Sequence, residues 1–466
     1  MPVDDVPTTY VAALEDAIER VWDIAQDLGL RPFPTHYEIV PATVMYEIGS
    51  YGMPGRFSHW THGKAYQVQK TMYDYGLSKI YELVINTNPC EAFLLDTNTL
   101  LQNTLVAAHV LAHSDFFANN AYFADTSRRM ADTVSLNADR IHSYEFTHGR
   151  DEVEQLLDAV LSIQEHVDPY ADVEDVYPRR DSAPAPRDTG YDDLWDLDTR
   201  QERREAAKPP PRPRVAAKPS RPVRDLLLFI MEHSPRLEDW ERDVVAIVRS
   251  EMLYFFPQMQ TKIINEGWAS YWHARIMREL DLSEKDYLEF AHLHADILQP
   301  SRRQLNPYHL GFRILEDIER RWDAETGNGR EKLFQVRETE SDVSLIRNYL
   351  TKELVEDLDL YLYQRIGDEL VIVDKDWTDV RERLVGQLTD HGIPAIYAED
   401  GDYNGNRELY LRHGWEGQKL DRHYAEKTLE YIYRLWGRRV WLETWAAEDE
   451  RLILSFDAEN GHAAHE

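Results

Sequence analysis

Apolar and polar residues follow two different spacings in the first part of the chain. From Thr8 to Leu28, apolar residues recur at helical spacing, which predicts an amphipathic helix. Residues 80–86 and 91–95 instead alternate from one position to the next, and the Asn-Thr-Asn-Pro segment near their junction favours a turn. A second helical pattern runs from about Thr97 to Asn119. The pattern therefore predicts a β-hairpin that leads into a long helix.

The middle of the chain loses this periodicity. Residues 171–222 are rich in Pro, Arg and Asp, include a Pro-Pro-Pro run that begins at Pro209, and contain few apolar residues. Such a segment buries too little apolar surface to offset its conformational entropy, so we predict a disordered linker. On either side of it, residues 1–170 and 223–340 are mainly helical in pattern, and we expect them to form two halves of one core.

The last part of the chain changes to short alternating strands. Between residues 341 and 457, strand patterns flank two helical stretches, which predicts a small α+β domain, and residues 458–466 are expected to form a loose tail. The predicted fold class is therefore α+β. It comprises a mostly helical, zincin-like core with a small β-hairpin before the long helix, and a small α+β appendage at the C-terminus.

Composition and charge narrow the partners and the cellular location. The 466 residues include 52 Lys and Arg against 84 Asp and Glu, for a formal net charge of −32, which repels nucleic-acid backbones. No apolar run is long enough for a membrane span, and the N-terminus has no secretory signal. We therefore expect a cytoplasmic protein that binds neither nucleic acid nor membrane. The excess of carboxylates over lysines fits a salt-rich cytosol and suggests a halophilic archaeon.

Two histidines on the long helix are the first candidates for chemistry. His109 and His113 are four residues apart, so their imidazoles leave the same helix face, which also carries Leu105 and Phe116. Two inward-facing imidazoles one turn apart can bind a divalent metal, or they can be hydrogen-bonded core histidines. Because Cys90 is the single cysteine, a cysteine-cluster zinc site is excluded.

Glu266 is the candidate for a third ligand. It lies in an aromatic-rich helical segment, Asn265–His273, where a carboxylate is costly unless it is paired or bound to a cation. His273 shares its helix face and brings a further imidazole to that side. The alternatives for Glu266 are a salt bridge to Arg275 or Arg278, or exposure to solvent.

The order of these elements is typical of zincin hydrolases, in which strands precede a helix with two histidines and a later helix supplies a carboxylate. Zincins carry their general base in the sequence His-Glu-x-x-His, and Val110 occupies that position here. Another base is then needed. Glu82, Glu91 and Asp115 are candidates, as is neutral His59, which lies in a loop rich in Gly and Pro. His59 can equally hydrogen-bond the loop backbone.

Five segments carry a family resemblance: Met53–Trp60, Tyr81–Cys90, Ala108–Phe117, Asn265–His273 and Asn306–Phe312. In this order they resemble the SpoVR family, named for stage V sporulation protein R, over essentially the whole chain outside the linker. The resemblance implies a role in sporulation or stress. It also implies two partners, a PrkA-type serine kinase and a von Willebrand-like protein.

Two functions follow from the residues and the resemblance together. In the first, the protein hydrolyses an amide or related bond with the help of Zn²⁺ or another divalent metal. The metal ligands are then His109, His113 and Glu266, and the catalytic pocket residues are Glu82, His59 and His273. In the second, the protein is a non-catalytic regulator or scaffold that acts with the PrkA-type kinase. The same side chains would then form a buried polar network that fixes helix packing.

Overall fold

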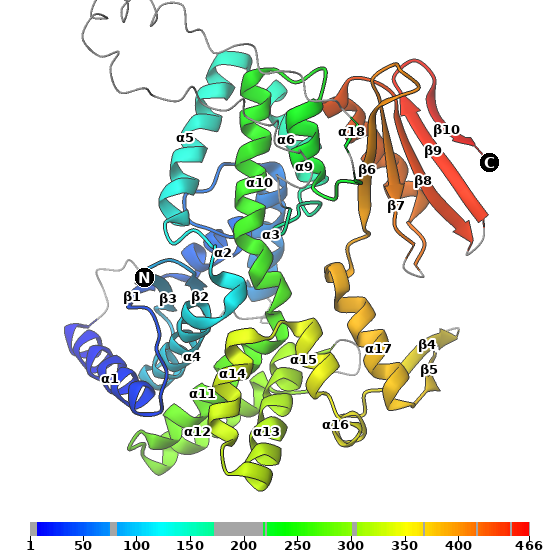
Figure 1. Ribbon diagram of the computed structural model, residues 1–466. Coiled ribbons are helices and arrows are strands. Elements are labelled where there is room, and N and C mark those ends of the chain that lie inside the picture. The colour runs from blue at the N-terminus through cyan, green and yellow to red at the C-terminus, as the bar shows by residue number, and fades with distance from the viewer. Residues whose placement is uncertain are drawn as a thin grey trace, which may run out of the picture. The chain divides into compact units, whose positions relative to one another are not determined.

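The computed structural model describes residues 7–74, 82–171, 218–219, 221–300, 305–366, 369–415, 418–447 and 450–465 (Figure 1). They form a mostly helical α+β protein with small sheets. The chain divides into two compact units: unit 1 contains Met1–Val153 and Leu253–Ile393, and unit 2 contains Glu154–Met252 and Pro394–Glu466. Over the residues described, no helix combines the length and the apolar character that a membrane crossing requires.

The first sheet of unit 1 contains the predicted hairpin. β2 (Leu83–Ile85) pairs antiparallel with β3 (Cys90–Leu95). β1 (Thr35–Val40), which follows the predicted first helix α1 (Thr8–Asp27), pairs parallel with the other edge of β3. Sequence analysis missed β1 because its partner lies far along the chain, and local periodicity does not report such a pairing.

The hairpin leads into α4 (Leu100–Asn119), which carries His109 and His113. The N-cap of α4 is Thr99: its hydroxyl accepts a hydrogen bond from the backbone N–H of Gln102, and the Gln102 side chain accepts one from the N–H of Thr99. The helix thus begins slightly later than the pattern predicts. Most of α4 is buried, so both histidines lie inside the protein.

A pair of glycines allows two other helices to approach closely. α11 (Lys262–Glu279) carries Glu266, and α13 (Pro307–Thr326) passes against it at Gly267 and Gly311. A Cβ atom on Gly267 would lie 2.4 Å from the carbonyl carbon of Gly311, so a side chain there would displace backbone. The close approach brings the N-terminal half of α13 against the part of α11 that carries Glu266.

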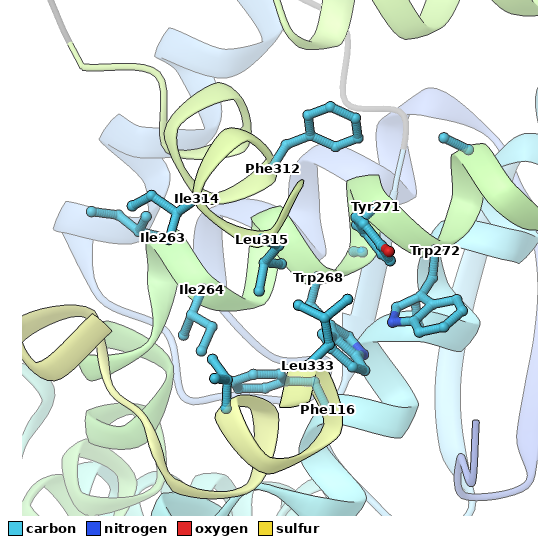
Figure 2. Packing of buried hydrophobic residues seen from close by; sticks show 14 of the residues in the cluster. Phe116, Ile263, Ile264, Trp268, Tyr271, Trp272, Phe312, Ile314, Leu315 and Leu333 are labelled. Carbon is cyan, nitrogen blue, oxygen red and sulfur yellow. The ribbon is translucent and has the colours of Figure 1, made fainter. Parts of the chain in front are cut away.

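The core of unit 1 packs around these helices, and Figure 2 shows part of it. Phe116 comes from α4, Trp268 and Trp272 come from α11, and Leu333 comes from α14 (Gly329–Thr339). All four side chains are fully buried. Burial of a single Phe or Leu side chain stabilises a fold by about 1.5–3 kcal/mol, so this cluster holds α4 and α11 in a fixed relation.

The remaining elements of unit 1 are mostly helices. In chain order they are α2 (Ala42–Tyr51), α3 (Trp60–Asp74), η2 (Ala121–Phe123), α5 (Met130–His148), α12 (Glu284–Ile297), α15 (Asp342–Tyr349), α16 (Lys352–Asp357), β4 (Leu362–Ile366), β5 (Glu369–Asp374), α17 (Trp377–Leu388) and η3 (Thr389–Gly392). Residues 341–393 thus belong to unit 1, whereas the sequence pattern assigned them to the C-terminal domain. The reason is packing, because Leu345 and Val380 are buried in the same cluster as Trp268.

Unit 2 is built on a five-stranded sheet with the order β10-β9-β8-β7-β6, and α18 (Arg422–Trp436) packs against one face of it (Figure 1). The strands are β6 (Ile396–Tyr403), β7 (Glu408–His413), β8 (Val440–Ala447), β9 (Glu450–Asp457) and β10 (Gly461–His465). The expectation of a loose tail is wrong for Gly461–His465, because these residues pair antiparallel with β9.

Three helices from earlier in the chain contribute to unit 2: α6 (Arg150–Leu161), α9 (Leu226–His233) and α10 (Asp239–Gln260), the last as far as Met252. The predicted linker, residues 171–222, lies almost wholly outside the described residues. Directly after it, Val223 pairs with Ala398, so the chain rejoins unit 2 beside β6.

Candidate metal centre

Four titratable side chains meet inside unit 1. Glu82, His109, His113 and Glu266 each offer one ligand atom, and these atoms all lie within 4.8 Å of one another. The exposed fraction of the side chain is 3% for His109, 5% for His113 and 6% for Glu266, against 23% for Glu82. Ligand atoms around one tetrahedral cation lie about 3–4 Å apart, so small side-chain shifts would bring these atoms onto a shared ion.

The atoms that face one another are imidazole Nε2 nitrogens and carboxylate oxygens. Nε2 of His109 lies 3.3 Å from Oε1 of Glu82 and 3.6 Å from Oε2 of Glu266. Nε2 of His113 lies 3.4 Å from the same Oε2 of Glu266. Because the two histidines are one helical turn apart, their ring centroids are separated by only 4.7 Å. Both imidazoles therefore present Nε2 to one carboxylate oxygen.

Two of these buried atoms, Nε2 of His109 and Oε2 of Glu266, have no hydrogen-bond partner among the described residues. They lie at ion-pair distance from each other, without the directional geometry of a hydrogen bond. An unsatisfied buried polar atom costs roughly 1–3 kcal/mol. A cation held between the nitrogen lone pair and the oxygen would satisfy both atoms at once.

The other ring nitrogen of each histidine is held by a buried partner. Nδ1 of His113 lies 2.8 Å from Oδ1 of Asn265, and since this oxygen can only accept, Nδ1 of His113 carries the proton. Nδ1 of His109 lies 2.7 Å from Nδ1 of His273, and Nε2 of His273 lies 2.8 Å from Nδ1 of His294 on α12. When each Nδ1 donates outward, Nε2 of both site histidines is left free to bind a cation.

His273 and His294 are neutral, which fits the hydrogen bonds of this histidine chain. Burial and the positive charge of His109 lower the pKa of His273 well below its usual value, and burial together with Arg278 lowers the pKa of His294 to about 4. A neutral His273 can accept the hydrogen bond from His109 at one nitrogen and donate from the other. The histidine chain therefore orients His109 without adding charge.

The carboxylates stabilise a positive charge at His109. Burial disfavours its imidazolium form, but the negative charges of Glu82 and Glu266 outweigh burial and raise the pKa of His109 to about 9. Burial also opposes ionisation of Glu266, yet His109, His113 and Lys262 hold its pKa well below the usual value. The negative charges of Glu82 and Glu266 would stabilise a metal ion at Nε2 of His109 as they stabilise a proton there.

Lys262 occupies the second oxygen of Glu266. It lies one helical turn earlier on α11, and its ammonium binds Oε1, so that Oε2 alone faces the histidines. A salt bridge to Glu266 thus exists, but not from Arg275, the partner considered from the sequence. Arg275 pairs instead with Glu319 of α13.

Tyr308 is a site residue that sequence analysis missed. Its hydroxyl lies 3.5 Å from Oε1 of Glu82, and its ring stacks against His109 with the centroids 6.1 Å apart. Asn306 caps α13 by accepting hydrogen bonds from the N–H groups of Tyr308 and His309, which fixes Tyr308 in the first turn. Burial and the nearby carboxylates raise the pKa of Tyr308, so its hydroxyl stays protonated and can donate. The signal available in the sequence was its place directly after the Asn-Pro cap.

The three predicted pocket residues have different positions. Glu82 is a member of the cluster, and of the four cluster residues it has the most exposed side chain. His273 lies behind His109 and contacts it through Nδ1. His59 lies just before α3, with its Nδ1 2.8 Å from Oγ1 of Thr61 and its ring beside His62, and it is not a member of the cluster.

Asp115, which was a candidate for the base, and Val110, at the position of the zincin base, both have other surroundings. Asp115 is fully buried in an ion pair with Arg337, with 2.9 Å between Oδ1 and Nη1. Val110, which stands where zincins have glutamate, is fully buried in an apolar cluster with Ala92 and Leu94 of β3. The face of α4 that carries Val110 therefore packs on the sheet rather than on the ligand cluster.

Two family models match the chain, and they meet at one of the boundaries between unit 1 and unit 2. Residues 8–393 match the family described as SpoVR like protein, and residues 394–447 match the family described as SpoVR-like C-terminal domain. The junction of the two matches coincides with the boundary between Ile393 of unit 1 and Pro394 of unit 2. All four cluster residues lie within the first match.

One relative is the Escherichia coli protein named uncharacterized protein YcgB, which is 29% identical over 483 residues, covering 95% of this chain and 93% of the relative. No solved structure matches the chain. The family match extends over most of the sequence and includes every residue of the ligand cluster, and the chain accordingly belongs to the SpoVR family.

Proposed function

We propose that the cluster in unit 1 binds a divalent metal ion and that the protein is a metal-dependent hydrolase of an amide or related bond. The observation that carries the proposal is the pair of buried, unsatisfied atoms, Nε2 of His109 and Oε2 of Glu266, which lie 3.6 Å apart. Zn²⁺ suits two imidazole nitrogens and one carboxylate oxygen, an arrangement that leaves a fourth position for water or substrate.

Three residues would hold the metal: His109 and His113 through Nε2, and Glu266 through Oε2. Lys262 keeps Oε1 of Glu266 engaged, so the carboxylate would bind through a single oxygen. Asn265 and His273 fix the ring orientation of the two histidines. When bound, a divalent cation supplies a Lewis acid that polarises a carbonyl group and lowers the pKa of a water molecule.

Glu82 is the best candidate for the general base. Its carboxylate lies beside Nε2 of His109 and is more exposed than the other three side chains, so it is the member of the cluster that substrate and water can reach. Burial opposes ionisation of Glu82, but His109 outweighs burial and lowers its pKa, so Glu82 is an anion that can accept a proton at neutral pH. This role fills the place that Val110 leaves vacant relative to zincins.

Tyr308 would act on the same reaction as a hydrogen-bond donor. Its protonated hydroxyl lies at the mouth of the cluster, 3.5 Å from Glu82, where it can donate a hydrogen bond to a carbonyl oxygen that gains negative charge. In the hydrolysis, Glu82 accepts a proton from a water molecule, and the resulting hydroxide adds to the carbonyl carbon. The carbon–nitrogen bond then breaks, and Glu82 passes the proton to the leaving amine.

Metal content is the primary test. We expect about one equivalent of zinc, manganese or iron per chain in wild-type protein purified without a histidine tag, and less than about a tenth in His109→Ala, because one of three protein ligands is lost. His142→Ala removes an exposed histidine of α5 and serves as the control. Less than half an equivalent in wild type, or equal contents in wild type and His109→Ala, would contradict the metal site.

A second variant separates the hydrolase from the non-catalytic regulator. Glu82→Gln keeps the shape of the side chain but removes the proposed base, so the hydrolase predicts normal metal content with hydrolysis of a peptide library reduced at least about 100-fold. The regulator predicts that Glu82→Gln complements a deletion strain as well as wild type, and that the wild-type protein cleaves none of the library.

A further inference from the structure

A pocket of about 370 Å³ opens directly beside the ligand cluster. Glu82, His109, His273 and Tyr308 line it at one end, so a molecule in the pocket touches both the proposed base and a proposed metal ligand. The remaining described lining residues come from α4 and α12. These residues have no part in holding the metal, so their chemistry indicates which kind of molecule the pocket binds.

The walls between the two helices are apolar. α4 contributes Leu105 and Val106, and α12 contributes Leu293 and Ile297. On α4 the lining continues to Gln102, which is seven residues before His109, so the pocket follows the helix for about 10 Å. A length of this size accommodates a side chain as large as leucine or phenylalanine beside the cluster.

Two carboxylates belong to the pocket lining. Glu82 and Asp296 are its acidic residues, and no lysine or arginine is among the described residues that line it. The nearest cation of the cluster, Lys262, is engaged with Glu266. Among the described lining residues outside the ligand cluster, Asp296 is the charged one, so this part of the pocket disfavours phosphate and carboxylate groups and accepts neutral and positively charged groups.

We propose that this pocket selects the substrate of the reaction: an amide whose acyl residue carries a bulky apolar side chain and a neutral or positively charged amino group. This assignment rests on the proposed function. The apolar side chain lies between Leu105 and Leu293, the amino group is attracted to Asp296, and the scissile carbonyl lies next to Tyr308 and Glu82. Peptides with a free N-terminal leucine or phenylalanine belong to this class, and acidic acyl residues do not.

Three hydroxamates test the assignment on the full-length chain loaded with Zn²⁺. Leucine hydroxamate carries the apolar side chain and an ammonium group, acetohydroxamate carries neither, and N-succinyl-leucine hydroxamate carries the side chain with a negative charge. We expect leucine hydroxamate to bind at least about tenfold tighter than acetohydroxamate, from burial of its side chain. The N-succinyl probe is expected to bind more weakly than leucine hydroxamate. Equal affinities, or tightest binding of the anionic probe, would overturn the assignment.

Two pocket variants locate the binding. Leu293→Trp fills the apolar space, so it should weaken leucine hydroxamate at least about tenfold and leave acetohydroxamate unchanged. Asp296→Lys, at an exposed position, should reverse the preference between the cationic and anionic probes. Unchanged affinities in both variants would overturn the assignment.

Metal content measured on the same samples separates the two ideas. Wild-type protein that binds no zinc contradicts the proposed function itself. Protein that binds zinc and acetohydroxamate, but does not prefer the leucine probe, contradicts only the substrate assignment.

Discussion

Two buried carboxylates, Asp115 and Glu266, lie in separate clusters beside α4, and they differ in how completely their oxygens are paired. In the first, Oδ1 of Asp115 accepts hydrogen bonds from the Arg31 N–H at 2.6 Å and from Nη1 of Arg337 at 2.9 Å. Oδ2 of Asp115 accepts from the indole of Trp268 at 3.0 Å and from the same guanidinium nitrogen at 2.9 Å. Both oxygens of this carboxylate are satisfied by the protein itself.

The cluster around Glu266 is incomplete by comparison. One oxygen of Glu266 binds Lys262, while the other lies beside Nε2 of His109 and, among the described residues, neither of these two atoms has a hydrogen-bond partner. Asp115 and Glu266 are both buried, and both clusters draw residues from α4 and α11. The difference therefore indicates that the Asp115 cluster holds the fold together, whereas the Glu266 cluster is arranged for a ligand.

The largest expected effect is on stability and concerns the Asp115 cluster. Asp115→Ala removes the buried partner of the Arg337 guanidinium and leaves it an ion pair with the exposed Glu338, so we expect the free energy of unfolding in urea to fall by about 3–5 kcal/mol. Asp16→Ala removes an exposed ion pair with Arg20 and should cost less than about 1 kcal/mol. If Asp115→Ala costs no more than Asp16→Ala, the comparison between the clusters fails.

The next effect is on metal binding and concerns the incomplete cluster. Glu266→Gln keeps the size of the side chain but removes the charge and a ligand, so Zn²⁺ affinity should fall at least about 100-fold. The unfolding free energy of the metal-free protein should change less than in Asp115→Ala, because Lys262 is 58% exposed and can turn to water. Glu279→Gln, on an exposed turn of the same helix, is the control for affinity measured by competition with a chelator.

A smaller effect is expected one step away from the ligands. His273→Phe removes the acceptor for Nδ1 of His109, so Zn²⁺ affinity should fall about 10–100-fold. His273→Asn retains an amide oxygen that can accept this hydrogen bond, so it should recover part of the loss. Equal affinities for wild type and His273→Phe would mean that the histidine chain does not position His109.

The smallest effect is on pH dependence. Zn²⁺ must displace the proton that the carboxylates stabilise on His109, so its affinity should rise about tenfold for each pH unit from 7 to 9 and level off above the pKa of about 9. In the metal-free protein the sign is opposite. Because the folded pKa is raised, the stability that protonated His109 provides is present below about pH 6.5 and is lost as pH rises through about 9. A metal affinity that does not change between pH 7 and 9 would contradict this account of His109.

The convergence of His109, His113 and Glu266 could be predicted because each of them carries a local signal. The i, i+4 spacing of His109 and His113 on an apolar helix face shows that both point inward, and a carboxylate at Glu266 is conspicuous in an aromatic-rich segment. The hairpin before α4 was predictable from its alternation and its turn. These features depend on residues near one another in the sequence.

The surroundings of the ligands were not predictable in the same way. Tyr308 reaches Glu82 because Gly267 and Gly311 let two helices touch, and no local pattern states which helices cross there. Arg275 pairs with Glu319 because α13 passes beside it, whereas Lys262, four residues before Glu266 on the same helix, was a local signal that was not used. The predicted domain boundary at residue 341 differs from the observed one for a similar reason. Periodicity identifies the apolar face of an element, but it does not identify the core against which that face packs.

The most direct test of the metal site is a crystal structure of the zinc-loaded protein with diffraction data collected at the zinc absorption edge. We predict one strong anomalous peak about 2.0–2.2 Å from Nε2 of His109, Nε2 of His113 and Oε2 of Glu266, with Lys262 still bound to Oε1. A peak elsewhere on the chain, with the space between His109 and Glu266 empty, would contradict the account.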